Sequence, residues 1–239
     1  MNACRWRLAA AAVGLLLGIT VVPGSAASLS LTSQNFTPYR TCTITATPTT
    51  TTAVRDTTAQ QLAPTSNFGA LTTLTVSSGT GVNQRIYVRF DLTSCSPAIS
   101  SSATVRLATL RLFVTALPAL CRTLDIFPPT ASWVETTLTW NNQPFGTTLN
   151  NPPTGSRTGT FNVGTPVGCQ NLSTGVYVVG GTVTADVAKF VAGIATNFGW
   201  MIRDDSEGSA TTPTTIFSAK ELGIVAQEPQ LVITYVTVP

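Results

Sequence analysis

The chain has 239 residues, of which 43% are hydrophobic and only 10% are charged. An ordinary soluble domain has about 25% charged residues, but this hydrophobic fraction permits a full core and excludes a disordered polyanion. The formal net charge of +3 falls to 11 basic against 10 acidic residues without Arg5 and Arg7, which lie in a segment that we expect to be removed. Nucleic acid is therefore a poor candidate partner, because phosphate binding requires a concentrated basic surface.

Residues 1–27 have the layout of a secretory signal peptide. Arg5 and Arg7 form a charged beginning, residues 8–22 are small or apolar, and small residues suited to cleavage follow. An apolar run of this length is short for a membrane span of about 20 residues, although an uncleaved anchor is the alternative. We expect a secreted, extracellular protein whose mature chain has no membrane span.

Residues 28–52 are rich in Thr, Ser and Pro, which is typical of a linker or stalk. Residues 42–45 alternate in polarity, however, and Cys42 requires a partner further along the chain. We therefore interpret residues 28–52 as an N-terminal arm that is at least partly ordered. Residues 53–239 form the expected domain.

Four cysteines remain after the signal segment: Cys42, Cys95, Cys121 and Cys169. An even number in an exported chain predicts two disulfides, and the sequence leaves all three pairings open. No pair has the C-x-x-C spacing of a metal site, so we predict structural disulfides and no cysteine-bound metal.

From residue 53 onward, short apolar/polar alternations are separated by turns rich in Gly, Pro and Asn, which indicates a β-sandwich or barrel. Within residues 103–116, the candidate core residues are Leu107, Leu110 and Leu112. The strands that we expect are residues 53–56, 71–76, 85–92, 103–116, 124–127, 176–179, 200–203, 215–218 and 231–235.

Three further segments stand out between these strands. In residues 133–144, Trp133 and Trp140 flank a Thr-rich run. This run predicts a turn into a short strand that ends before a proline. Residues 145–170 show little periodicity and predict long surface connections. Residues 184–194 give the one helical signal, with Thr184 as a plausible N-cap.

The alternation in residues 85–92 is strict, so Arg85, Tyr87 and Arg89 should share the outward face of one strand. Arg111 and Arg203 occupy similar outward positions on other strands. Such a row suits a uronate polymer, because guanidinium pairs a carboxylate through two hydrogen bonds and a tyrosine ring covers a sugar face. In the alternative interpretation, these arginines form structural cross-strand ion pairs. The acidic partners would be Asp91, Asp125, Asp204, Asp205 and Glu221.

Other candidate sites are weaker. Trp200, in phase with Ile202, is expected in the core, whereas Trp133 and Trp140 are either core residues or a stacking platform. Residues 204–208 form the one acidic cluster and could coordinate Ca²⁺, but they do not match an EF-hand loop. We predict no cofactor, with structural calcium as the one possibility.

Seven motifs, in a consistent order over residues 53–236, resemble the DNRLRE-type domains, which are grouped with carbohydrate-binding module family 96. The motifs are Y-V-R-F-D-L (87–92), T-L-R-L-F-V (109–114), S-W-x-E-x-T-L-T-W-N-N-Q-P (132–144), D-V-A-K-F-V-A-G (186–193), F-G-W-M-I-R-D (198–204), F-S-A-K-E (217–221) and P-Q-L-V-I-T-Y (229–235). The resemblance implies a secreted jelly-roll β-sandwich of two antiparallel sheets, often appended to polysaccharide lyases or bacterial surface proteins. Some members bind acidic polysaccharide such as alginate through basic side chains on one sheet. This chain departs in its four cysteines and in having no attached catalytic domain.

The sequence thus predicts an all-β, non-catalytic, secreted carbohydrate-binding module with one short helix. Its expected partner is a polysaccharide, of the acidic uronate type, held by Arg85, Tyr87, Arg89, Arg111 and Arg203. The alternative is a structural or adhesive surface protein with no sugar ligand. An enzyme is disfavoured because the chain contains no histidine, the commonest general base. The oligomeric state is left open.

Overall fold

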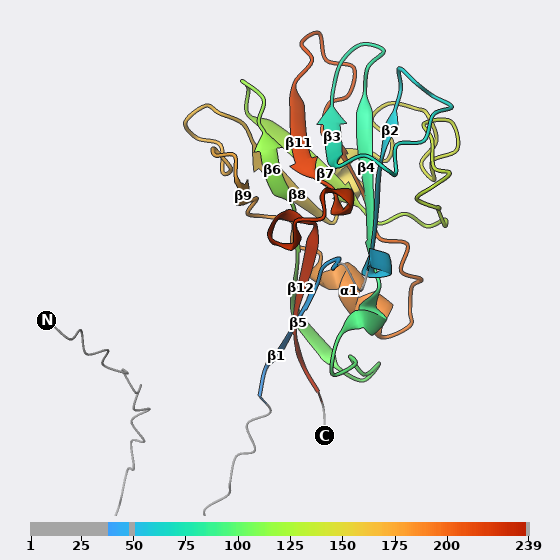
Figure 1. The fold of residues 1–239 in the computed structure, drawn as a ribbon, viewed down its shortest axis with the longest axis vertical. Helices are drawn as coiled ribbons and strands as arrows, with labels where there is room; N and C mark the ends of the chain where they lie inside the picture. The colour runs from blue at the N-terminus through green and yellow to red at the C-terminus, as the bar shows by residue number, and fades with distance from the viewer. Residues whose placement is uncertain (1–37, 48–50, 238–239) are drawn as a thin grey trace, which may run out of the picture. The chain divides into compact units, whose positions relative to one another are not determined.

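The computed structural model describes residues 38–47 and 51–237. The expected signal peptide and most of the 28–52 arm lie outside these residues. Within the described part, twelve strands form two antiparallel sheets, and one α-helix accompanies them. The predicted all-β sandwich with a single short helix is confirmed (Figure 1).

The smaller sheet has the strand order β1 (Arg40–Ile44), β12 (Gln230–Val236) and β5 (Thr104–Arg111). The larger sheet has the order β8 (Gly159–Val163), β7 (Arg122–Phe127), β10 (Trp200–Asp204), β4 (Gln84–Phe90), β3 (Thr73–Ser77), β11 (Thr214–Ser218), β6 (Phe113–Ala116) and β9 (Val176–Tyr177). A further strand, β2 (Val54–Gln60), pairs with β4 along its whole length. The 3-10 turns are η1 (Thr51–Ala53), η2 (Leu92–Ser94), η3 (Thr154–Ser156), η4 (Lys220–Leu222) and η5 (Val225–Gln227).

The N-terminal arm joins the domain through β1. Its residues pair with β12 over the register Arg40–Ile44, and Cys42 forms a disulfide with Cys95. The second disulfide joins Cys121 to Cys169. Two disulfides are therefore confirmed, and the structure supplies the pairing that the sequence leaves open.

The main core lies between the sheets and comes from the apolar phase of the alternating strands. Ile86 and Val88 on β4, and Trp200 on β10, have no exposed surface. The expectation for Trp200 is confirmed, and its indole Nε1 donates to the buried Asp186 carboxylate at 2.8 Å. Burying such side chains contributes about 1.5–3 kcal/mol each, which makes this cluster the main source of stability.

The expected strand 103–116 is two strands, because the chain passes from the smaller sheet to the larger one at Leu112. Leu110 and Leu112 are buried as predicted, but Leu107 is 48% exposed. The prediction for Leu107 is wrong because β5 meets β12 with a register shift between Thr234 and Tyr235, which changes the phase along the strand.

The helix α1 (Thr184–Val191) occupies the predicted place, but its N-cap is Val183. The Thr184 hydroxyl instead accepts a hydrogen bond from the backbone N–H of Ala108 on β5. Val187 faces the core and is fully buried. The predicted capping role of Thr184 is thus wrong, since its oxygen ties the helix to the sheet.

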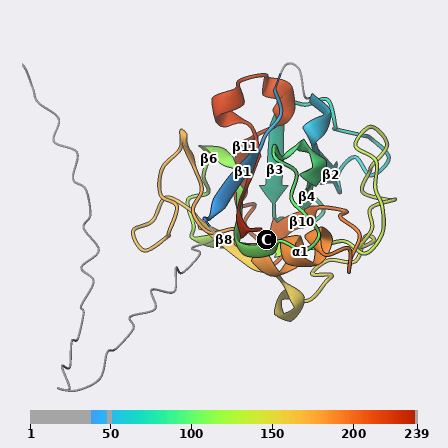
Figure 2. The ribbon, with the colours of Figure 1, turned by 90° about the horizontal axis from the view of Figure 1, so that it is seen from below.

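Residues 128–153, which we call the cover segment, contain no helix or strand, so the strand expected in 133–144 is absent. A strand does occur where long connections were expected, as β8 pairs with β7. The cover segment lies beside β2 in both ribbon views (Figures 1 and 2). Its residues Trp133, Leu138 and Trp140 form a second apolar cluster with side chains on the outward side of the large sheet: Ala59, Tyr87, Phe127 and Met201.

Candidate functional site

The cover segment buries part of the row of side chains that the sequence places on the outward face of the large sheet. Arg85, Tyr87 and Arg203 have relative exposures of 0%, so the expectation that they line an open sheet face is wrong. The physical reason is that the two tryptophans of the cover segment bury the sheet's outward face. Whether a strand face is open depends on a connection that local alternation does not describe.

Arg85 is the central polar group beneath the cover. Its Nε and Nη2 donate to the two carboxylate oxygens of Glu207 at 2.7 and 2.8 Å, and both side chains are fully buried. The guanidinium also donates to the carbonyls of Gly146 and Thr148 at 2.9 and 2.7 Å and lies 4.7 Å from the Trp140 ring centroid. Arg85 thus fixes the course of the cover segment.

Tyr87 has a similar role. Its hydroxyl donates to Oε1 of Gln143 at 3.0 Å, and its ring meets Trp133 edge-on at 5.7 Å between centroids. Burial raises the pKa of Tyr87 well above its ordinary value, so the phenol stays neutral. A neutral, buried phenol suits packing and does not offer a free ring face to a ligand.

Arg203 is held by backbone oxygens. Its Nη2 donates to Pro152 and its Nη1 to Asp204, both at 2.6 Å, and burial lowers its pKa. Asp125 is its cross-strand neighbour and is also fully buried. Burial raises the pKa of Asp125 to about 6 from an ordinary 3.8, although Arg157, 3.4 Å away, and Arg203 oppose the shift.

This shift predicts a pH dependence of stability. Because the folded pKa of Asp125 lies above its unfolded value, folding favours the protonated acid, and its ionisation removes stability as pH rises from about 4 to 7. Asp125→Asn should therefore raise the free energy of unfolding relative to the unmodified protein by up to about 3 kcal/mol at pH 7 and by little near pH 4. Urea unfolding of both proteins at several pH values measures the difference. A difference that does not change with pH would contradict this reading.

The acidic stretch 204–208 is engaged with arginines. Arg122 forms ion pairs with Asp204 and with Asp205, and its hydrogen bond with Asp204 raises the Arg122 pKa. Glu207 is the buried partner of Arg85. The cluster considered as a calcium ligand set is therefore neutralised by cations of the chain itself.

Arg111 lies at the end of β5, on the smaller sheet, and is not brought together with Arg89 on β4. Its guanidinium lies 4.4 Å from the Tyr177 ring centroid, and Nη1 donates to Oε1 of Gln230 at 3.2 Å. Burial is the main cause of a raised Tyr177 pKa. This half-buried pair is a separate feature of the surface.

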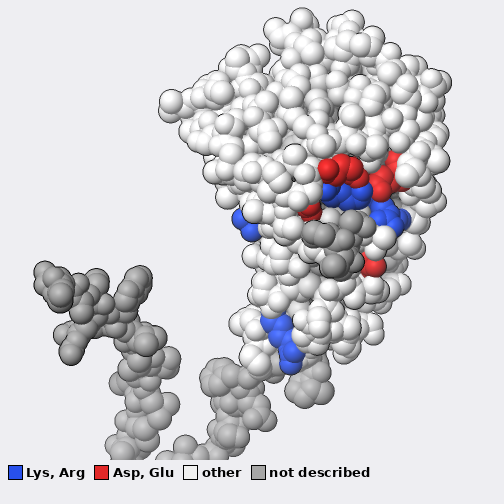
Figure 3. Space-filling model, viewed as in Figure 1, with Lys and Arg blue, Asp and Glu red and all other residues white. Residues whose placement is uncertain are grey.

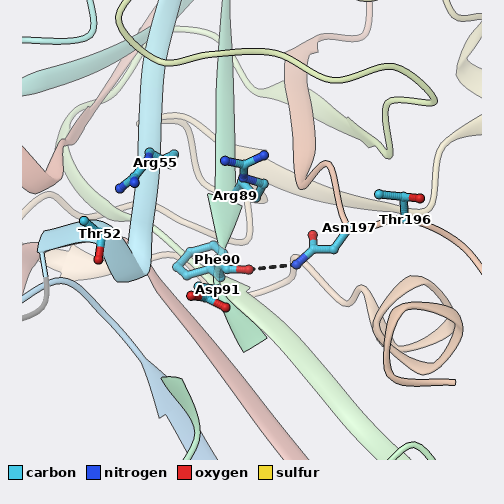
Figure 4. Close-up of a pocket in the computed structure, with 7 residues that line it drawn as sticks. All are labelled: Thr52, Arg55, Arg89, Phe90, Asp91, Thr196 and Asn197. Atoms are coloured by element: carbon cyan, nitrogen blue, oxygen red, sulfur yellow. Dashed lines mark hydrogen bonds between the residues drawn. The ribbon is translucent and has the colours of Figure 1, made fainter. Parts of the chain in front are cut away.

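Arg89 of the predicted row opens onto a cavity with a volume of about 430 Å³ (Figure 4). The cavity lies between the start of β2, the end of β4 and the loop of residues 192–199 that precedes β10. Its polar lining residues are Thr52, Arg55, Arg89, Asp91, Thr196 and Asn197.

Arg55 and Arg89 occupy directly paired positions on the antiparallel strands β2 and β4. Like charges in such positions repel, so an acidic neighbour would normally accompany them. All ten acidic residues of the chain lie within the described residues, and none is within 4.0 Å of either guanidinium. Asp91, in the lining, is exposed and accepts hydrogen bonds from Thr93. Within the described residues, the two guanidinium groups thus form no ion pair, and Asp91 is the acidic residue that shares their cavity.

The surroundings orient this pair. The Arg89 guanidinium lies 5.7 Å from the Trp133 ring centroid, and the indole Nε1 is fixed by a 2.7 Å bond to the Phe198 carbonyl. Asn197 donates to the Phe90 carbonyl at 2.8 Å, as Figure 4 shows. Sequence reasoning missed Arg55, which alternates correctly in residues 53–56, because its position opposite Arg89 follows from strand pairing.

These features define a β-sandwich with a polar cavity beside the paired strands β2 and β4. The chain belongs to carbohydrate-binding module family 96, whose family model matches residues 47–235. No curated protein matches the sequence. Within the described residues, no helix has the length and apolar character needed to cross a membrane.

Proposed function

We propose that this chain is a non-catalytic, secreted module that binds an acidic polysaccharide, of the uronate type, at the cavity of Arg55 and Arg89. The observation that carries the proposal is the arginine pair, without an ion-pair partner, at a cavity in a member of a carbohydrate-binding family. Both guanidinium groups have donors free for a carboxylate. The repulsion between them would be relieved when an anionic ligand binds.

The rest of the cavity supports a sugar ligand. Thr52, Thr196 and Asn197 supply hydroxyl and amide groups beside the arginines, which suit the hydroxyl-rich edge of a sugar ring. The two disulfides agree with an oxidising, extracellular location. Arg85, Tyr87 and Arg203 act in this proposal through the cover segment, and Arg111 lies apart from the cavity.

Affinity electrophoresis of the mature domain in gels that contain alginate, pectate or a neutral glucan tests the proposal. We expect retardation by the uronate polymers alone, weakened by added salt because charge pairs are screened. Retardation by the neutral glucan alone would overturn the uronate assignment. Free migration of a folded domain in every gel would favour the structural or adhesive alternative. Release of reducing ends from any of these polymers would overturn the non-catalytic assignment.

Trp133 should contribute to binding through Arg89. We expect Trp133→Leu to weaken uronate affinity about 2- to 5-fold, because a cation–π contact of about 0.5–1 kcal/mol is lost. Trp140→Leu is the matched control, since Trp140 is also buried in the cover segment but stacks on Arg85. Titration calorimetry with a uronate oligosaccharide measures both. Equal losses in the two variants would show that Trp133 acts through the fold alone.

A further inference from the structure

Three carboxylates converge away from the cavity, from segments far apart in the sequence. Asp56 lies on β2, Glu135 on the cover segment and Glu221 in the turn η4. One carboxylate oxygen of each lies within 4.8 Å of those of the other two. The sequence gives no sign of this group, because its members are separated by 79 and 86 positions.

One cation of the chain partly balances this group. Lys220 Nζ pairs with Glu135 Oε1 at 2.9 Å and with Glu221, so three potential negative charges face a single positive one. The side chains of Glu135 and Glu221 are only 11% and 19% exposed, and Asp56 is 1% exposed. In Figure 3, the acidic side chains on the visible face lie at mid-height beside basic ones, a further basic patch lies lower, and the surface above carries no charged side chain.

Two carboxylate oxygens of the group accept no hydrogen bond, and burial together with the nearby Glu221 raises the pKa of Asp56 well above its ordinary value. Asp56 Oδ2 accepts a 3.0 Å bond from the Lys220 backbone N–H, whereas Asp56 Oδ1 and Glu221 Oε2 are buried without a hydrogen bond. A buried acceptor without a donor carries a desolvation penalty of about 1–3 kcal/mol, more for a charged group. Lys220 therefore leaves these two carboxylate oxygens free to coordinate a cation.

We propose that Asp56, Glu135 and Glu221 bind a hard divalent cation, Ca²⁺ by preference, which joins the cover segment to β2 and η4. Oxygens within 4.8 Å of one another suit a shared ion at 2.3–2.6 Å, the usual Ca²⁺–oxygen distance. Water fills the remaining positions through the partly exposed side of Glu221. The ion holds Glu135, two residues from the Trp133 that orients Arg89, but its binding does not depend on the proposed carbohydrate function.

Calorimetric titration of the chelator-treated protein with CaCl₂ tests the proposal, alongside thermal unfolding with and without millimolar Ca²⁺. We expect one ion per chain and a rise in Tm, since a ligand of the folded state stabilises it. Asp56→Asn and Glu221→Gln should each weaken Ca²⁺ binding at least about 10-fold, because each removes a charged ligand. Asp205→Asn, in the separate cluster beside Arg122, should leave the affinity unchanged.

The variant Lys220→Met distinguishes two interpretations of the carboxylate group. Either the group binds a cation, or Lys220 already satisfies it. We expect this variant to bind Ca²⁺ at least about 10-fold more tightly, because the competing ammonium is removed. Its Tm should fall without Ca²⁺ and recover with it. Absence of heat and of any Tm change with millimolar Ca²⁺, Mg²⁺ or Mn²⁺, in the unmodified protein and in folded Lys220→Met, would overturn the proposal. Undiminished Ca²⁺ affinity in Glu221→Gln would also overturn it.

Discussion

Arg85→Met is expected to lower the free energy of unfolding by about 3–5 kcal/mol, the range found when one partner of a buried ion pair is removed. The change leaves the Glu207 carboxylate fully buried without its bidentate partner. The carbonyls of Gly146 and Thr148 also lose their donors, so the cover segment loses its fixed course. Urea unfolding followed by tryptophan fluorescence measures the loss and reports on Trp140, which stacks on Arg85.

Two further variants sharpen this test. Arg106→Met removes an exposed arginine from β5 and should change stability by less than about 0.5 kcal/mol. Arg85→Met combined with Glu207→Leu should be more stable than Arg85→Met alone, because no buried charge is left unpaired. An Arg85→Met protein as stable as the unmodified one would mean that Arg85 does not hold the cover segment.

Arg55→Ala and Arg89→Ala are each expected to weaken uronate affinity about 10- to 100-fold, since a hydrogen bond to a charged group contributes about 1.5–3 kcal/mol. The expected effect on stability is opposite in sign. For Arg55→Ala this follows because the two arginines face each other across β2 and β4 without an ion-pair partner, so its removal relieves repulsion and should raise stability by a few tenths of a kcal/mol, whereas Arg89→Ala also loses the contact with Trp133. Titration calorimetry with a uronate oligosaccharide and urea unfolding measure the two quantities.

The double variant and a control complete this experiment. Losses for Arg55→Ala and Arg89→Ala should not be additive in the double variant, because both groups contact one carboxylate-bearing ligand. Arg106→Ala removes the same charge from an exposed position on the other sheet and should keep full affinity apart from a small, salt-sensitive change. If all three arginines mattered equally, binding would reflect general charge and not the cavity.

Local pattern predicted most of the fold. The strict alternation of residues 85–92 identified β4 and its core phase, and the helical spacing around Val187 identified α1. These predictions succeed because each strand or helix buries one face against the core, which imposes its period on the sequence. The cysteine count similarly predicted two disulfides, while their pairing required the fold.

The site was less predictable because it depends on which segments meet. The phase of Arg85 and Tyr87 was assigned correctly as opposite to the core, yet both are buried under residues 128–153. Nothing periodic in that irregular segment indicates that it crosses the sheet. Arg55 likewise became a candidate only through its pairing with Arg89, a contact between strands that alternation does not specify.

The most direct test of the central claim is to observe the arginine side chains while a ligand binds. In ¹⁵N-labelled protein titrated with a uronate trisaccharide, we expect the Nε–Hε signals of Arg55 and Arg89 to shift in a saturable manner. The signals of Arg85 and Arg203, which are buried beneath the cover segment, should stay in place. Saturable binding that shifts Arg111 or Arg106 and leaves Arg55 and Arg89 unmoved would contradict the assignment of the cavity as the carbohydrate site.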